Sequence, residues 1–398
     1  MSKKVFYPLL EDPYRKKDLL SAIKVIKTGR ITIGKHTKNF EKKFSKKINT
    51  NFSLMVNSGS SANLLALQCL INPYRKNRLK LGDSVLIPSV CWSTSLWPII
   101  QSGLKPVFVD VDIKTLNIDL NDLSKKISNQ TKALMLVHVL GNSTNMDKLM
   151  KILRKNKIIL IEDTCESLGS KFKNKYLGTF GEFSSFSFYS SHQISSGEGG
   201  MITCKNLDDY EIIKSLRSHG WSRGLRNEAE ISKHNKHLDS RFIFYNSGFN
   251  LRPTDVSAAI GYSQFKDMNK LINIRYLNRN KIVNFLKRNR KINNNFQFIE
   301  ANTNVKPSWF GIPILIKNKN NRKKFLINLE KKGIETRPII SGNFLKQPSV
   351  IKYNLLSKKI KFHNSDIINN NGFFIGLPGK KISNTFISNL VKIFEESI

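Results

Sequence analysis

Short apolar runs recur through the chain up to about residue 270, separated by longer segments. Each run is rich in β-branched residues and bounded by turn-forming residues, which is typical of strands buried inside a sheet. The strand candidates are SVLIPS (84–89), PVFVDVD (106–112), KALMLVHVL (132–140) and KIILIED (157–163), and helix candidates between them include 61–71 and 145–155.

Alternation of strands and helices predicts an α/β fold, with a mostly parallel central sheet and helices on both faces. The pattern changes from about residue 263. A long helix candidate is followed there by shorter mixed elements, at 264–288, 309–317, 325–333, 334–340 and 382–396. We therefore predict a large α/β domain over 1–262 and a smaller C-terminal α+β domain over 263–398.

The composition indicates the kind of cellular environment that suits the protein. The 398 residues are 40% hydrophobic, which is enough for a sizeable core, and the N-terminal stretch is charged and interrupted by prolines. No apolar run has the length of a signal peptide or a membrane-spanning helix. The four cysteines are widely spaced and form no C-x-x-C pair, so neither a disulfide framework nor a thiolate metal site is indicated. We expect a soluble protein of the reducing cytoplasm, without membrane insertion and without a bound metal.

The formal net charge is +37, which raises the question of a nucleic-acid partner. The lysines are spread along the chain, asparagine is equally conspicuous, and no nucleic-acid-binding motif is present. Drift in composition explains the charge better, and we expect no nucleic-acid binding. A basic surface would still help to attract an anionic small substrate.

Two polar segments follow apolar strand candidates. Ser58–Asn63 opens a helix with small residues, and the free N–H groups at a helix start can bind a phosphate. Asp163 ends a strand, where a carboxylate can pair with the ring nitrogen of a cofactor. Taken alone, the first segment is more often an ordinary capped helix start, and Asp163 has an equal chance of capping the next helix.

A third segment, 183–200, alternates aromatic residues with serines and then enters a polar turn rich in glycine. The hydroxyl group of Ser187 suits a phosphate. His192 lies in the turn, at the mouth of the predicted sheet. A lone histidine is more often structural than catalytic, but the small polar neighbours of His192 leave it room to act.

Together with four further segments, these stretches resemble the DegT/DnrJ/EryC1/StrS sugar-aminotransferase family, a branch of the fold-type I pyridoxal-phosphate enzymes. The resemblance covers nearly the whole chain and implies a homodimer whose active sites are shared between subunits. The segments, in family order, are SGSSANLLAL, PSVCWSTSLWPI, VDVDIKTLNID, IEDTCESLGS, SFSFYSSHQISSGEGG, RSHGW and GFNLRP.

The resemblance assigns a role to each matching residue. Trp92 is expected to stack on the pyridine ring of the cofactor, Asp163 to pair with its ring nitrogen, and Glu166 to face its ring hydroxyl. The phosphate is expected to be held by Gly59, Ser60 and Ser187, and by Asn250 reaching over from the neighbouring subunit. His219 is expected to contribute to the substrate site. Arg252 and Arg337 are candidates to clamp the glutamate carboxylates or the sugar diphosphate, with a surface or interdomain ion pair as the alternative for each.

The chain departs from the aminotransferases at His192, where they have a lysine. An imidazole is not a primary amine, so pyridoxal or pyridoxamine phosphate would be held without a covalent link. A histidine can still move protons, because its unperturbed pKa is about 6.5. The expected outcome is loss of the C3 hydroxyl group from a nucleotide-linked 4-keto-6-deoxyhexose.

This replacement of lysine by histidine resembles the sugar 3-dehydratases of the family. One type acts on GDP-4-keto-6-deoxymannose and uses L-glutamate as the amino donor. The other acts on a CDP-linked sugar and needs an iron–sulfur cluster and a reductase. The wide cysteine spacing favours the GDP type, in a pathway to 3,6-dideoxy sugars of surface polysaccharide, with no iron–sulfur reductase as partner.

Three alternatives remain open from the sequence: the CDP-linked dehydratase, an aminotransferase whose lysine function has moved, and a binding protein without catalysis. Intact Asp163, Trp92 and Glu166 speak against the last, because a site without chemistry has no need of them. A charged segment at 223–245 is a candidate cover for the substrate, but nothing in the sequence determines its role.

Overall fold

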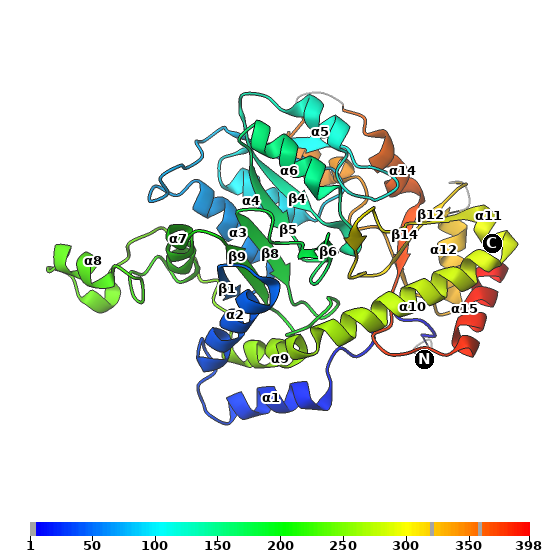
Figure 1. The fold of residues 1–398 in the computed structure, drawn as a ribbon, viewed down its shortest axis with the longest axis horizontal. Coiled ribbons are helices and arrows are strands. Elements are labelled where there is room, and N and C mark those ends of the chain that lie inside the picture. The colour runs from blue at the N-terminus through cyan, green and yellow to red at the C-terminus, as the bar shows by residue number, and fades with distance from the viewer. Residues whose placement is uncertain (1–4, 319–321, 357–359) are drawn as a thin grey trace.

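A seven-stranded sheet forms the centre of the protein. The computed structural model describes residues 5–318, 322–356 and 360–398 (Figure 1). Strand β9 runs antiparallel to both of its neighbours, and the remaining neighbours are parallel, so the predicted mostly parallel sheet is confirmed. The strand order is β1 (Phe52–Val56), β9 (Gly200–Cys204), β8 (Phe183–Ser187), β5 (Ile159–Asp163), β4 (Thr131–Val137), β2 (Ser84–Pro88) and β3 (Lys105–Val109).

Both faces of this sheet are buried, because successive residues of its strands are apolar and point to opposite sides. In β4, Ala133, Met135 and Val137 join one hydrophobic cluster, and Leu134 and Leu136 join another. The predicted helices on both faces are therefore confirmed. The first cluster includes side chains of α3 (Gly59–Leu70), α4 (Ser93–Gln101) and α7 (Leu207–Arg217), and the second those of α5 (Leu120–Lys126) and α6 (Met146–Lys155).

Strand β4 is shorter than the predicted run 132–140. It ends at Val137, and the backbone then turns through a short helical turn, Val139–Gly141, in which Leu140 has a positive φ of 51°. The apolar run continues because these turn residues are themselves buried. The turn carries the chain toward the carboxyl end of β5, where the candidate site lies.

The N-terminal helices α1 (Lys16–Ile26) and α2 (Lys35–Ile48) pack against α9 (Asp255–Lys266). The prediction of a single helix over 264–288 is wrong at its start. Asp267 separates α9 from α10 (Met268–Arg288), a long helix that leads to the C-terminal part (Figure 1). The predicted domain division after residue 262 falls inside α9 and stays a prediction.

A four-stranded antiparallel sheet organises the C-terminal part, in the order β10 (Phe296–Phe298), β12 (Ile312–Ile316), β14 (Gly372–Ile375) and β13 (Thr336–Arg337). Of the predicted strand 334–340, only β13 is paired in this sheet. Tyr7, from the start of the described chain, is buried in the same core. The helices that follow α10 along the chain are α11 (Arg290–Asn295), α12 (Arg322–Lys331), α13 (Pro348–Lys352), α14 (His363–Asn371) and α15 (Asn384–Ser397). A separate small sheet joins β11 (Val305–Lys306), β6 (Lys171–Phe172) and β7 (Lys175–Tyr176).

Helix α8 (Glu228–His234) lies within the charged segment 223–245 and projects from the body of the molecule beyond α7 (Figure 1). A small cluster of Leu225, Ile231 and Ile243, with Tyr245 packed against it, holds the segment together. Among the helices of the described residues, none is long and apolar enough to cross a membrane.

Candidate active site

Asp163 is the fixed point of the candidate site. It ends β5 and is 5% exposed. One carboxylate oxygen accepts hydrogen bonds from Asn63 Nδ2 at 2.8 Å and Ser95 Oγ at 2.7 Å, and the other accepts one from the Cys165 backbone N–H at 3.2 Å. Donors of this kind stabilise a buried carboxylate and fix its direction. Sequence reasoning missed Asn63 and Ser95, although both lie inside the motifs that drew attention to their neighbours.

Gly59 lies where the start of α3 meets the ends of β8 and β9. A Cβ on Gly59 would be 2.6 Å from Cys165 Sγ and 2.9 Å from Ser187 Cβ, so only glycine allows this approach. Gly200, the register partner of Ser187, would likewise place a Cβ 2.5 Å from the Gly59 nitrogen. These contacts bring the N–H groups at the helix start close to the Ser187 hydroxyl, as a phosphate requires. The structure therefore places these predicted phosphate ligands together.

Ser60 and Trp92 lie beside this cradle. The Ser60 hydroxyl forms a hydrogen bond with Thr94 Oγ1 at 2.8 Å, which ties the start of α3 to the first turn of α4. Trp92 occupies the N-cap position of α4, and its side chain is 57% exposed. A large aromatic side chain this exposed offers a free face on which a planar ring can stack.

Glu166 is held by the turn that follows β4. One of its carboxylate oxygens accepts a hydrogen bond from the Leu140 N–H at 2.8 Å. Burial raises the pKa of Glu166 to about 7, and the negative charge of Asp163 adds to the rise, while the Leu140 hydrogen bond opposes it. The side chain thus takes up or releases a proton near neutral pH, next to the carboxylate of Asp163.

His192 is half-buried in the turn after β8. Its ring lies edge-on to the ring of Phe310, with centroids 5.1 Å apart, and Ser191 Oγ is 3.5 Å from Nδ1. Burial lowers the pKa of His192 to about 4; the charge of Asp163 opposes this effect and the charge of Arg275 adds to it. The imidazole is therefore neutral at pH 7 and has a nitrogen lone pair available to accept a proton.

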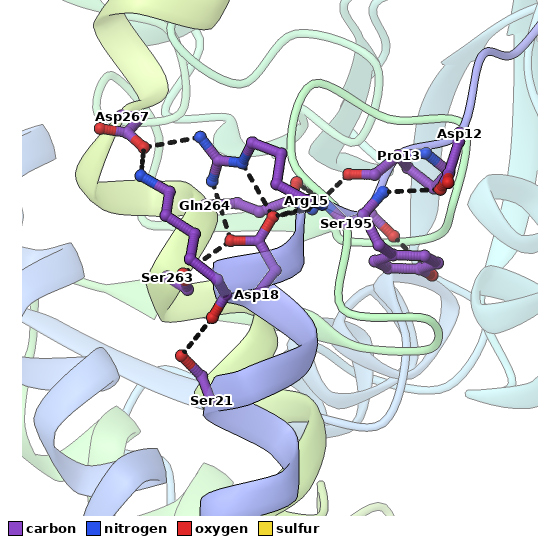
Figure 2. A network of polar contacts seen from close by, with 11 residues as sticks. Asp12, Pro13, Arg15, Asp18, Ser21, Ser195, Ser263, Gln264 and Asp267 are labelled. Atoms are coloured by element: carbon purple, nitrogen blue, oxygen red, sulfur yellow. Dashed lines mark hydrogen bonds and ion pairs between the residues drawn. The ribbon is translucent and has the colours of Figure 1, made fainter.

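A buried glutamine anchors the turn that carries His192 (Figure 2). Gln264 of α9 accepts a hydrogen bond from the Ser195 N–H at 2.8 Å and donates one to the Pro13 carbonyl at 2.6 Å. The Tyr14 hydroxyl is also hydrogen-bonded to Ser195 Oγ, at 3.1 Å. Figure 2 shows Gln264 between Asp18 of α1 and Ser195, so the N-terminal segment and α9 together fix the turn. Because these partners are distant in sequence, no local motif pointed to them.

The predicted residues His219, Asn250 and Arg252 form a second group around Trp221. Arg252 Nε donates a hydrogen bond to Asn250 Oδ1 at 3.1 Å, and its guanidinium lies over the Trp221 ring at 5.6 Å. The ring of His219 is 5.0 Å from that of Trp221. Arg252 also lines a cavity of about 300 Å³ together with Asn57, Ser196 and Glu198. These contacts join the three residues to one another, and their predicted roles stay predictions.

Arg337 lies on β13 of the C-terminal sheet. Its side chain is exposed and donates a hydrogen bond to the Thr336 carbonyl at 2.8 Å. Its predicted contact with the substrate stays a prediction.

Comparison with known proteins identifies the family. The DegT/DnrJ/EryC1/StrS aminotransferase family matches residues 13–379. The chain belongs to this family. The predicted membership is thereby confirmed, and the fold described above is that of the solved structures of the family.

Among its relatives, the GDP-4-keto-6-deoxy-D-mannose 3-dehydratase of Escherichia coli O55:H7 is 37% identical over 374 residues, which cover 93% of this chain and 95% of that protein. Two solved structures of GDP-4-keto-6-deoxymannose-3-dehydratase superpose with a TM-score of 0.90 at 35% identity, and cover 98% of this chain and 100% of theirs. One is a variant with bound GDP-perosamine, and the other holds a trapped PLP-glutamate geminal diamine.

All four cysteines, Cys69, Cys91, Cys165 and Cys204, are free thiols. Within the described part of the chain, no group of three His, Cys, Asp or Glu side chains could hold a metal ion.

Proposed function

We propose that the protein is a pyridoxal-phosphate-dependent 3-dehydratase of GDP-4-keto-6-deoxy-D-mannose, with L-glutamate as the amino donor. The observation that carries the proposal is the neutral imidazole of His192 beside Asp163. His192 occupies the position at which the aminotransferases that this chain resembles have lysine. The name of the relative that is 37% identical over almost its whole length supports the same activity. The product would be a 3-deoxy keto-sugar on the way to a 3,6-dideoxy sugar.

The residues fit the cofactor that this activity needs. Gly59, Ser60 and Ser187 offer a cradle for its phosphate, and Gly59 admits no side chain there. The exposed ring of Trp92 would stack on the pyridine ring, and the buried carboxylate of Asp163 would keep its nitrogen protonated. When bound as the amine, the cofactor supplies an amino group for the keto-sugar and a ring that accepts electrons.

Within this site, the protein's own task is to move protons. The neutral imidazole of His192 accepts a proton at a ring nitrogen and returns it, and Phe310 excludes water from one side of that ring. Glu166 offers a second group that can exchange a proton, because its pKa lies near neutral pH. Because imidazole forms no imine, the keto-sugar is not driven toward release as an amino sugar.

We also propose a homodimer in the cytoplasm, in which Asn250 reaches the cofactor phosphate of the partner subunit. Asn250 is exposed and hydrogen-bonded to Arg252, in the group around Trp221. A partner subunit would bring these polar side chains to a second site. Sedimentation equilibrium tests the dimer, and a mixture of Asn250→Asp and His192→Asn subunits tests the shared site through recovery of activity.

The activity is tested by incubating the protein with pyridoxal phosphate, L-glutamate and GDP-4-keto-6-deoxy-D-mannose and measuring the product mass. A product lighter by one oxygen atom, formed only with glutamate, is expected. An amine in place of the ketone would mean an aminotransferase. If the GDP sugar is unchanged, turnover of the CDP-linked sugar would indicate the other dehydratase type, and no turnover of either would indicate a binding protein.

Replacement of the histidine tests the base directly. His192→Asn keeps a polar side chain of similar size but cannot accept the proton, so kcat should fall by roughly 100-fold or more. His234→Asn, at the exposed end of α8, is the control and should keep full activity. Unchanged dehydration by His192→Asn or by His192→Lys would refute the assignment.

A further inference from the structure

Arg275 of α10 holds the backbone next to His192. Its guanidinium donates hydrogen bonds to two consecutive carbonyls, from Nε to Trp309 at 3.1 Å and from Nη2 to Phe310 at 2.5 Å. Two bonds from one planar fork fix both the position and the direction of that short segment. Phe310 lies in a short motif, WFG, that also resembles the family, whereas no motif pointed to Arg275.

The fixed segment contacts the site in two ways. The ring of Phe310 lies edge-on to the ring of His192 at 5.1 Å. The Phe310 N–H donates a hydrogen bond to the Leu140 carbonyl at 3.1 Å, and the Leu140 N–H is the group that holds Glu166. A shift of the Phe310 backbone would therefore move the wall behind the imidazole and disturb the turn that holds Glu166.

The charge of Arg275 acts on the same imidazole. Across residues 5–318, 322–356 and 360–398, Arg275 makes no ion pair within 4.0 Å, and the nearby Glu11 is paired with Lys380 at 3.2 Å. Two charged groups influence His192 from the surrounding elements: Asp163 of β5 raises its pKa and Arg275 of α10 lowers it. On the same turn, Tyr189 presents a phenol ring whose centroid is 6.2 Å from that of the imidazole.

We propose that Arg275 is a positioning residue for His192: it clamps the carbonyls of Trp309 and Phe310, so that Phe310 supports the imidazole ring, and it brings a positive charge to that side of the site. The proposal rests on the role of His192 as the proton acceptor of the proposed function. The charge disfavours the imidazolium, so the base stays ready to accept a proton. The clamp on the two carbonyls keeps the Phe310 ring edge-on to the imidazole and so fixes the orientation of the imidazole.

The same helix offers a matched control. Arg279 lies one turn further along α10, is 5% exposed, and also bonds a backbone carbonyl, that of Ile299. It lies over the Trp309 ring at 4.9 Å, and it pairs with Glu300 at 2.7 Å. A substitution of Arg279 should loosen the same packing without changing the charge that acts on His192.

The experiment follows the titration of the His192 ring protons by NMR in the full-length protein without added cofactor. The His192→Asn variant assigns the signal. Arg275→Gln removes the charge and most of the clamp, Arg275→Lys keeps the charge but lacks the fork, and Arg279→Gln is the control. The pKa of His192 should rise by roughly 0.5 to 1 in Arg275→Gln and stay at the wild-type value in the other two.

Steady-state kinetics give the second measurement. The acid limb of the kcat profile should move to higher pH in Arg275→Gln, because the base becomes protonated more easily. Arg275→Lys should lower kcat by about 10-fold without moving the limb. The proposal is overturned if Arg275→Gln leaves the pKa of His192 unchanged, or if Arg279→Gln shifts it equally. A shift as expected in a protein without dehydratase activity would instead refute the proposed function alone.

Discussion

Burial shifts the pKa values of Glu166 and His192 in opposite directions, and in both cases it favours the uncharged form of the side chain. It raises the pKa of Glu166 to about 7 and lowers that of His192 to about 4, because each charged form loses water on entering the site. Hydrogen-bond donors surround the carboxylate of Asp163 and fix its direction. Burial thus favours the uncharged forms of Glu166 and His192 next to a carboxylate that is held in place by its donors.

Glu166 gives a prediction about stability and pH. Its ordinary pKa is 4.5, so between pH 4.5 and 7 the folded protein binds more protons at this side chain than the unfolded chain does, and stability falls as pH rises. Glu166→Gln cannot ionise, so its stability relative to the wild type should increase by about 3 kcal/mol between pH 4.5 and 8. His192 has the opposite slope, but it is present in both proteins and cancels. Urea unfolding at several pH values measures this gain, and a difference independent of pH would contradict it.

Gly59 gives a prediction about cofactor affinity. Gly59→Ala would place a methyl group 2.6 Å from Cys165 Sγ and 2.9 Å from Ser187 Cβ, which must push the cradle open. The affinity for pyridoxal phosphate should fall by about 10-fold or more, measured by quenching of tryptophan fluorescence. Gly379→Ala, which meets no atom within 4 Å, is the control and should bind as wild type does. Equal affinities would show that the cradle does not hold the phosphate.

The residues of the site that the sequence revealed are those that lie in short motifs. Asp163, Gly59 and Ser187 sit at element ends, where a strand or helix leaves its side chain or N–H groups facing one edge of the sheet. Gln264 and Arg275 escaped notice because they act on backbone groups, through contacts that exist only after the chain has folded. No pattern of residue types in the sequence predicts such a contact.

At the scale of elements, α2 depends on a residue from α9 for its start. The N-cap residue of α2 is Gly34, which has no side chain to offer. Asp255 takes its place: its carboxylate accepts hydrogen bonds from the N–H groups of Gly34, His36 and Thr37 at 3.1, 3.1 and 2.7 Å. The negative charge also lies at the favourable end of the helix dipole. Helices α2 and α9 are thereby joined as one unit.

Removal of this cap should destabilise the fold. Asp255 is 4% exposed, so Asp255→Ala would leave one buried and two partly buried N–H groups without this acceptor and should cost about 3 kcal/mol. Asp255→Asn retains one acceptor and should cost about half as much. Asp239→Ala, at an exposed ion pair with Arg241, is the control and should leave the free energy of unfolding close to that of the wild type. Similar values for Asp255→Ala and the control would refute the role of this cap.

The central strands were predictable because burial on both faces makes them continuous apolar runs. The predicted segments 84–89 and 157–163 match β2 and β5 to within two residues at each end. The predicted element bounds were wrong where a run of residues does not form one continuous strand or helix. The apolar residues after Val137 are buried in a turn, and the helix predicted over 264–288 conceals a break at Asp267, where no proline or glycine marks it.

At the scale of the whole molecule, the net charge of +37 opposes folding, since a compact shape brings like charges together. Salt screens this repulsion over distances of about 10 Å at 0.1 M. The melting temperature should therefore rise when sodium chloride is increased from about 10 mM to about 300 mM. Differential scanning fluorimetry measures it, and a neutral osmolyte of equal osmolality is the control. A falling melting temperature would mean that attractive ion pairs dominate.

The C-terminal sheet takes part of its core from the opposite end of the chain. Tyr7 lies beside Ile334, and its hydroxyl donates a hydrogen bond to the Gly376 carbonyl at 2.9 Å, a contact that spans 369 residues. At a synthesis rate of 5–20 residues per second, Tyr7 is added to the chain roughly 20 to 70 seconds before its acceptor is made. The large sheet has time to form during that delay, before the carbonyl group that binds the Tyr7 hydroxyl has been synthesised. Translation thus sets the order of assembly, and the Tyr7 segment can dock only long after it has been synthesised.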